Sequence, residues 1–428
     1  MNININNSAL QKAFAIILGI LSANNLITVF TIGNTSILGI YLYCAIVFVL
    51  ISFWDSSALY GALKMITKDL WLFALFVVLS IFQVLLFSKS YIHQWRVGVI
   101  LFLLNCLVLV TVLMMRSYGT YIIKGVAVGI LINAIISLIA LALYKRGVYI
   151  QTIMIQVFPD AINIWLPRLG SEFRAMGLFK EPGHLMRYVG ILALPVLAKL
   201  KDEREGFFYR TTLVCTLFLL AYTLSSSVFV FAVFLFLYVV HKRGNIRYVK
   251  RRTIFVAFAV IALPIALMTI FPDLWNSIIT GLIIGVTDIF NFDGSNSYRM
   301  LSIYNILSII KDYPFLGVGW NLSASYMAAY GFINDRIKDS YSFVLKIVAE
   351  MGIFVIPFLY FVFSKAKTLV NRDNSQYQRA LGWSLLMYFA LASITDYKFD
   401  GSVSILIGLV LIEVCGNKYY RRADTNKQ

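Results

Sequence analysis

The chain has 428 residues, of which 60% are apolar and 13% are charged, and its mean hydropathy is +0.81. Because soluble domains carry about 25% charged residues, these values exclude a soluble globular enzyme, a disordered chain and a disulfide scaffold. They indicate an all-α integral membrane protein, since a helix satisfies its own backbone hydrogen bonds in lipid. The net charge is +17, and because the basic residues that cause it lie between apolar segments, we attribute it to membrane topology. We therefore expect contact with membrane lipid and no nucleic-acid partner.

Apolar segments long enough to cross a bilayer follow one another along the chain. We expect about twelve transmembrane helices, at about 9–31, 36–54, 70–88, 96–115, 121–144, 184–200, 207–224, 226–241, 254–272, 342–364, 380–396 and 401–416. They make residues 1–428 a single membrane domain without a separate soluble part.

The distribution of Lys and Arg predicts the orientation of these spans. The basic block from Lys242 to Arg252 is the strongest anchor, and with it most basic residues fall on the side of both termini. By the positive-inside rule, both termini are cytoplasmic. Two outer loops are then long, at 145–183 and 273–341, and long loops in compact proteins are usually functional.

The first large loop ends in the densest polar cluster of the sequence. Pro182 suits the first turn of a helix, and Glu181 then lies near its N-cap, where the helix dipole favours a carboxylate. His184 and Arg187 are three residues apart and share one face. The cluster is either a capped helix with interfacial charges or a pocket for an anionic lipid-linked substrate. In the pocket, Arg174 and Arg187 grip phosphate oxygens, and Glu181 or His184 acts as general base.

The second large loop contains an amphipathic stretch at 300–310, which we expect to be a short interfacial helix. The glycines of Phe315-Leu-Gly317-Val-Gly319-Trp320 mark a turn. Lys346 and Glu350, four residues apart beside the next span, are expected to form an ion pair. Aromatic residues fill membrane cores and interfaces, but a few outer ones are also candidates to stack on sugar rings, namely Trp165 of the first loop and Tyr298, Trp320 and Tyr341 of the second.

The last hairpin carries Asp396, Lys398 and Asp400 on the same side as these loops. We interpret these charges as ordinary loop solvation. No nucleotide-binding glycine loop and no metal-ligand spacing is found in the sequence, so no cofactor and no metal are expected.

Three motifs in this order resemble the Wzy-type O-antigen polymerase and O-antigen ligase superfamily of bacterial envelopes. They are Arg174-x-x-Gly-Leu-Phe-x-Glu-Pro-Gly-His184, Arg299-x(11)-Lys311-Asp-Tyr-Pro-Phe-Leu-Gly-Val-Gly319 and Ser342-Phe-Val-Leu-Lys-Ile-Val-Ala-Glu-Met-Gly-Ile353. The resemblance covers about 170–360 by motif and the rest of the chain by the layout of its spans.

This resemblance implies a GT-C-like glycosyltransferase of the bacterial inner membrane with a periplasmic active site. Its substrate is an undecaprenyl-diphosphate-linked oligosaccharide, and undecaprenyl diphosphate is released. A Wzz-type chain-length regulator and a Wzx-type flippase are the implied partners. The family's loop arginines map by position to Arg299 and to Arg174, with Arg168 or Arg187 nearby. Apart from the resemblance, the acceptor hydroxyl needs a base, and the candidates in this sequence are Glu181, His184 and Asp339, in that order of preference.

Two alternatives to a polymerase stay open. The ligase branch carries a histidine at the end of the second loop, whereas this chain has Asp339-Ser340-Tyr341 and no histidine after His241. This difference favours the polymerase. A lipid-linked oligosaccharide flippase or transporter needs charges along a cavity within its spans, and the predicted spans are nearly free of charge.

Overall fold

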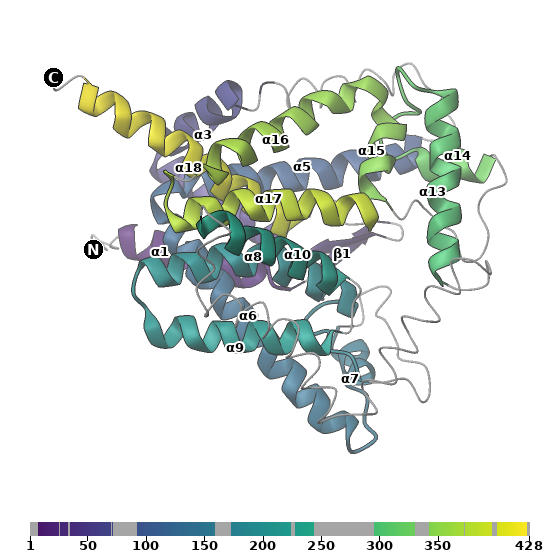
Figure 1. Cartoon of the computed structure of the whole chain (residues 1–428), viewed down its shortest axis with the longest axis horizontal. Coiled ribbons are helices and arrows are strands. Elements are labelled where there is room, and N and C mark those ends of the chain that lie inside the picture. Colours follow the sequence, from purple (N-terminus) through teal and green to yellow (C-terminus); the bar gives the residue numbers. More distant parts are fainter. Residues whose placement is uncertain are drawn as a thin grey trace.

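The computed structural model describes residues 7–24, 26–32, 35–69, 71, 92–158, 173–223, 227–243, 295–329, 342–371, 373–395 and 400–425. Helices dominate these residues, and most of them run side by side along the longest axis of the molecule (Figure 1). Helix α1 (Asn7–Leu21) begins and α18 (Gly401–Thr425) ends at the same end of the bundle, which we call the terminal end. The opposite end, which we call the loop end, carries the described parts of both large loops.

The remaining helices of the first half are α2 (Gly39–Trp54), α3 (Ser56–Asp69), α5 (Ile92–Met114), η2 (Arg116–Tyr118), α6 (Gly119–Tyr144) and α7 (Ile150–Val157). Those of the second half are α8 (Pro182–Asp202), α9 (Gly206–Tyr222), α10 (Ser227–Arg243), α13 (Ser295–Asp312), α14 (Ser323–Ala329), α15 (Phe343–Met351), η4 (Gly352–Val355), α16 (Ile356–Val370) and α17 (Gln376–Ile394).

The described helices confirm a multi-pass membrane protein. Four helical segments are long and apolar enough to cross a bilayer, or five if α2 and α3, which meet at a bend of 115°, count as one span. The expected spans at 70–88 and 254–272 lie almost wholly outside the described residues. The count of about twelve spans and the GT-C-like arrangement therefore stay predictions.

The expected first span at 9–31 is wrong as a single helix. Helix α1 ends at Leu21, and strands β1 (Thr28–Ile32) and β2 (Thr35–Leu38) pair antiparallel after it. The Asn24 side chain accepts hydrogen bonds from the backbone N–H of Leu26 at 2.8 Å and of Ile27 at 3.1 Å, which turns the chain away from a helix. The β-branched residues that follow favour the strand, so a two-stranded hairpin follows α1 in a mainly helical protein.

The expected span at 342–364 is present but interrupted. Helix α15 ends at Met351, one turn of 3₁₀ helix follows, and α16 begins at Ile356. Gly352 has a φ of 54°, a left-handed conformation that no regular helix contains. Pro357 in the first turn then restarts the helix where its missing N–H is not needed.

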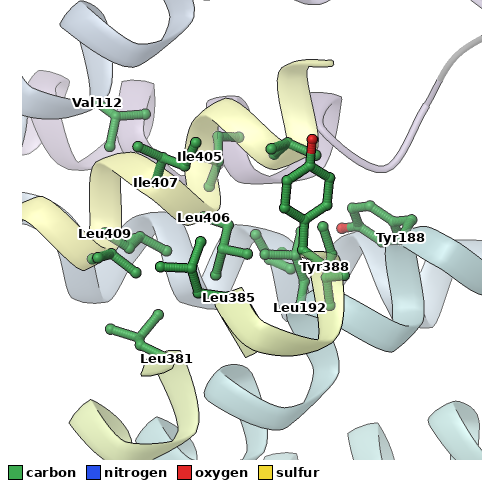
Figure 2. Packing of buried hydrophobic residues seen from close by; sticks show 14 of the residues in the cluster. Val112, Tyr188, Leu192, Leu381, Leu385, Tyr388, Ile405, Leu406, Ile407 and Leu409 are labelled. Carbon is green, nitrogen blue, oxygen red and sulfur yellow. The ribbon is translucent and has the colours of Figure 1, made fainter. Parts of the chain in front are cut away.

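Helix α8 is the centre of the core. It contacts α6, α9, α10, α17 and α18, and most of its side chains are buried. Figure 2 shows Tyr188 and Leu192 of α8 among side chains of α17 and α18, with Tyr388 standing close to Tyr188. Because α8 begins at the loop end, its first turn is held by the packing of the whole bundle.

Helices α1 and α6 approach each other through glycines. A Cβ atom on Gly125 would meet the backbone carbonyl of Ile16, and one on Gly19 would meet that of Ile122. A Cβ on Gly129, one turn further along α6, would meet the side chain of Ala23. Small residues four apart permit such backbone contact between membrane helices. They bring the end of α1 against the part of α6 that supports the first large loop.

The terminal end carries a group of ion pairs. Lys124 of α6 pairs with Glu205 and, at 3.5 Å, with Glu203 in the turn between α8 and α9. Lys199 reaches Glu203 at 3.7 Å and lies over the ring of Tyr377. These side chains are about a third exposed or less, so this group ties the α8–α9 turn to α6 and α17.

Candidate functional site

The described end of the first large loop is bound to helix α9. The backbone N–H of Ala175 donates to the carbonyl of Tyr222 at 2.8 Å, and Nε of Arg174 donates to the carbonyl of Thr223 at 3.0 Å. These carbonyls lie at the C-terminal end of α9, where the helix leaves its last acceptors unpaired and favours positive charge. Arg174, predicted to grip phosphate, therefore also caps a helix.

Asn133 of α6 supports the turn that follows. This fully buried side chain donates to the carbonyls of Ala23 at 3.0 Å and Gly129 at 2.8 Å, and its Oδ1 accepts from the N–H of Leu178 at 2.7 Å. Gly177 has a φ of 53°, and a Cβ there would overlap Asn133. The glycine is thus required by both backbone conformation and contact. Sequence reasoning missed Asn133, because a lone polar residue in an apolar helix carries no motif.

Glu181, His184 and Arg187 come together at the first turn of α8, as predicted. Glu181 is the N-cap and Pro182 follows in the first turn. The Glu181 carboxylate Oε1 lies 3.0 Å from Nε2 of His184 and 3.1 Å from Nη2 of Arg187. Arg187 also donates from Nε to the carbonyl of Gly183 at 3.0 Å. Its side chain is only 8% exposed, whereas those of Glu181 and His184 are 42% and 39% exposed.

Asp400 is a second carboxylate whose charge interacts with that of Arg187. It precedes α18, and its Oδ1 accepts hydrogen bonds from the hydroxyl of Ser402 at 2.6 Å and the N–H of Val403 at 3.0 Å. Burial raises the pKa of Asp400, whereas these hydrogen bonds and the positive charge of nearby Arg187 act in the opposite direction. The interpretation of Asp400 as an ordinary solvated loop charge is therefore wrong. The sequence offered only its place before an apolar helix as a signal.

The second large loop contributes α13, which runs across the loop end of the bundle in Figure 1. The helix extends over Ser295–Asp312, so the predicted helix at 300–310 is confirmed and is longer than expected. Tyr298 and Arg299 belong to its first turn. Its position at the membrane interface stays a prediction.

The glycine-rich turn after α13 docks on the break between α15 and α16. The N–H groups of Val318 and Gly319 donate to the carbonyls of Ala349 and Glu350, each at 2.9 Å, and Ile353 donates back to the carbonyl of Phe315 at 3.1 Å. The predicted turn is confirmed, with a φ of 66° at Gly317 and 100° at Gly319. Two of the three motifs therefore meet in space through backbone hydrogen bonds.

Lys346 and Glu350 form the predicted ion pair in a buried setting. Nζ of Lys346 lies 4.0 Å from Oε1 of Glu350, and their side chains are 6% and 3% exposed. The same oxygen accepts a hydrogen bond from the hydroxyl of Ser323 at 2.7 Å. Ser323 is the first residue of α14, so Glu350 connects α15 to that short helix.

Other contacts join this loop to the bundle. The ring of Trp320 packs edge-on against Phe102 of α5 at 5.5 Å between centroids, and Asn321 lies against Gly98 of the same helix. Trp320 was predicted to stack on sugar, and its contact with Phe102 gives it a packing role as well. At the start of α15, the hydroxyl of Ser342 donates to the carbonyl of Ser393 in α17 at 2.7 Å.

Several predicted site residues are not placed by the structure. Arg168, Asp339 and Tyr341 lie outside the described residues, as does Asp396. Tyr298 and Arg299 lie in α13, and their side chains are outside the described part. The roles assigned to these residues therefore stay predictions.

The arrangement at the start of α8 suits recognition of an anionic group. An arginine held on one side by a carboxylate and on another by a backbone carbonyl is fixed in orientation before a ligand arrives. The carboxylate that holds it is partly exposed and has a histidine as its second partner. Such a group can accept a proton from a hydroxyl placed beside it.

Fold and site together define a multi-pass helical membrane protein with a preorganised polar site at the loop end of the bundle. Residues 211–360 match the family described as O-antigen ligase. This match agrees with the resemblance drawn from the three motifs, and over this segment the chain is similar to the O-antigen ligase family. Two of the motifs lie inside the matched segment, and the motif from Arg174 to His184 precedes it. No curated protein matches the chain.

Proposed function

We propose that this protein is a surface-polysaccharide polymerase of the bacterial inner membrane. It transfers a growing oligosaccharide from undecaprenyl diphosphate to the end of the next lipid-linked repeat unit and releases undecaprenyl diphosphate. In this proposal both termini are cytoplasmic and the loop end of the bundle faces the periplasm. The family match supports glycosyl transfer on a lipid-linked sugar in general terms, and the finer reaction is our proposal.

The observation that carries this proposal is the shared contact of Glu181 with Arg187 and His184. A departing diphosphate accumulates negative charge, and a fixed guanidinium stabilises that charge in the transition state. As the phosphate oxygens bind Arg187, they compete with Glu181 for the same N–H groups. The carboxylate is then available to take the proton of the attacking sugar hydroxyl, with His184 as its neighbour.

The second large loop supplies the other side of the proposed site. Arg299 and Tyr298, in the first turn of α13, are assigned to the substrate, and so are Arg168 and Tyr341 of the loops. Asp339 is the remaining candidate base. These assignments follow from the family pattern and from the course of α13 across the loop end (Figure 1).

An O-antigen ligase is the second candidate, because the matched family is described by that name. A ligase would move finished polymer from undecaprenyl diphosphate to the lipid A core. The absence of a histidine after His241 favours the polymerase. A Wzz-type regulator and a Wzx-type flippase are proposed as partners of the polymerase.

A gel of lipopolysaccharide from cells that lack the gene separates these candidates. We expect the long ladder to collapse to core plus one repeat unit, and the intact gene on a plasmid to restore it. Rough core with accumulated lipid-linked polymer would instead identify a ligase. An unchanged ladder, with capsule also unchanged, would contradict both.

A further inference from the structure

The second large loop is joined to the bundle at a buried ion pair between Lys346 and Glu350 of α15. Glu350 is 2% exposed and Lys346 is 5% exposed, although charged side chains are rarely buried so completely. A buried pair of this kind contributes little net stability, because desolvation offsets the attraction between the charges. Net stability of α15 therefore does not by itself explain why this pair is present.

The carboxylate of Glu350 is aimed at the loop. Oε1 accepts from the hydroxyl of Ser323 at 2.7 Å and lies 3.4 Å from the backbone nitrogen of the same residue. The backbone carbonyl of Glu350 accepts from Gly319 at the same time. One residue of α15 therefore binds both the glycine-rich turn and the beginning of α14.

Glycines on both sides permit this close approach. A Cβ on Gly317 would overlap the backbone of Glu350, and a Cβ on Gly352 would overlap the carbonyl of Phe315. Both glycines have positive φ, at 66° and 54°. The glycine-rich turn and the break after α15 are therefore in direct backbone contact, in the alignment that their hydrogen bonds define.

Residues 295–329, which we call the second-loop arm, also share a small core with α15. Its buried apolar members come from α13, the glycine-rich turn, α14 and α15, and they are Ile306, Ile309, Val318, Met327 and Ala349. Because α13 packs on this core, its position depends on how the arm is docked on α15.

We infer that Glu350 is a positioning residue whose carboxylate oxygen docks the second-loop arm on the α15–α16 break and so sets where α13 presents its first turn to the substrate. The inference rests on the proposed function, because it gives Tyr298 and Arg299 a defined place in the site. Glu350 itself is buried under the arm and acts through Ser323 and the turn.

Two double variants separate this role from the charge pair. Lys346→Met with Glu350→Gln removes both charges and keeps a side-chain oxygen for Ser323. Lys346→Met with Glu350→Leu removes both charges and that oxygen. Both variants remove the two charges of this pair together, because removing one partner alone would be strongly destabilising by itself. The two variants differ in the side-chain amide of residue 350, whose oxygen is the acceptor that the inference requires.

Hydrogen exchange of the full-length protein in lipid nanodiscs reports the docking of the arm. In the Leu variant, we expect the amides of residues 318–326 to exchange about tenfold faster, since loss of one buried hydrogen bond changes a local opening equilibrium by about that factor. In the Gln variant, we expect exchange as in the wild type. Equal exchange in both variants would overturn the inference.

The polysaccharide ladder of cells carrying each variant reports positioning. We expect the Gln variant to restore the ladder and the Leu variant to reduce polymer at least about tenfold at equal protein level. Equal ladders despite faster exchange would show that docking is purely structural and would overturn the positioning role. A wild-type gene without effect on any surface polysaccharide would instead overturn the proposed function, and the exchange comparison would still decide whether Glu350 docks the arm.

Discussion

Asn133 of α6 fills the space that a side chain on Gly177 would need, and its Oδ1 accepts the N–H of Leu178 at 2.7 Å. The turn that precedes α8 therefore packs against α6, a helix from an earlier part of the chain. Glu181 follows only a few residues later, so this contact helps to fix the position of the polar cluster at the start of α8. A substitution at Gly177 therefore tests directly whether Asn133 supports this turn.

Gly177→Ala should destabilise the protein by at least about 2 kcal/mol, because it adds a clash with Asn133 to a strained backbone. The matched control is Gly147→Ala. Gly147 has a φ of 77° and nothing within 4 Å of its Cβ position, so it reports the backbone cost alone, about 1 kcal/mol. Thermal unfolding in detergent measures both variants. Equal losses would contradict the role of Asn133.

Arg187→Ala should abolish polymer while the protein still inserts in the membrane, because it removes the proposed partner of the phosphate. Arg187→Lys keeps the charge but not the geometry that pairs Nε with Gly183 and Nη2 with Glu181. We expect it to reduce polymer at least about tenfold. Arg146, an exposed arginine in the turn after α6, is the matched control for loss of charge. A normal ladder in Arg187→Ala would refute the proposed site.

Arg299→Ala should likewise abolish polymer, and Arg174→Ala should lower both polymer and stability. The difference arises because Arg174 caps the end of α9 through the carbonyl of Thr223, a contact worth about 1 kcal/mol. Ladder gels and thermal unfolding, measured on the same preparations, separate the two effects. Wild-type chain length in both variants would count against any role of these loop arginines.

Two of the lysines in ion pairs of the described bundle, Lys124 and Lys346, should respond very differently to replacement. Lys124→Met removes a pair that is about a third exposed, so we expect a loss within about 1 kcal/mol that disappears at high salt. Lys346→Met takes a cation away from the buried carboxylate of Glu350, and we expect a loss of about 3–5 kcal/mol that salt does not change. Denaturation at low and high ionic strength measures both. A large, salt-independent effect of Lys124→Met would contradict this ranking.

Lys180 should make stability depend on alkaline pH. Burial lowers the pKa of Lys180 below its ordinary value of 10.5, so folding disfavours its charged form. The resulting decrease in the free energy of unfolding is fully present below the lowered pKa. Between that pKa and 10.5 the unfolded chain binds more protons, so the free energy of unfolding rises with pH. Lys180→Met should remove this part of the slope, and a wild type and a variant whose free energies of unfolding change in parallel from pH 7 to 10 would contradict it.

Local patterns in the sequence were sufficient for much of the site. The helical spacing of His184 and Arg187, and the preference of Glu181 and Pro182 for a helix start, predicted the cluster that the structure contains. The i, i+4 spacing of Lys346 and Glu350 likewise predicted their pair. These interactions lie within one or two helical turns, where spacing along the chain fixes distance in space.

The first span shows where such patterns fail. Hydropathy alone favoured one helix from residue 9 to 31, but the side chain of Asn24 competes for backbone N–H groups and β-branched residues follow it. Both segments are apolar, so a hydropathy window does not separate a helix from a buried hairpin.

The sequence by itself determined the class of protein, the existence of most helices and the polar residues that begin α8, because these depend on composition and on contacts between near neighbours. Only the tertiary structure decided that Asn133 packs against Gly177, that the charges of Asp400 and Arg187 interact, and that Glu350 accepts a hydrogen bond from Ser323. Each of these contacts joins elements that are distant in the chain, and it exists because helix packing brings them together. No periodicity or local propensity encodes which helices become neighbours.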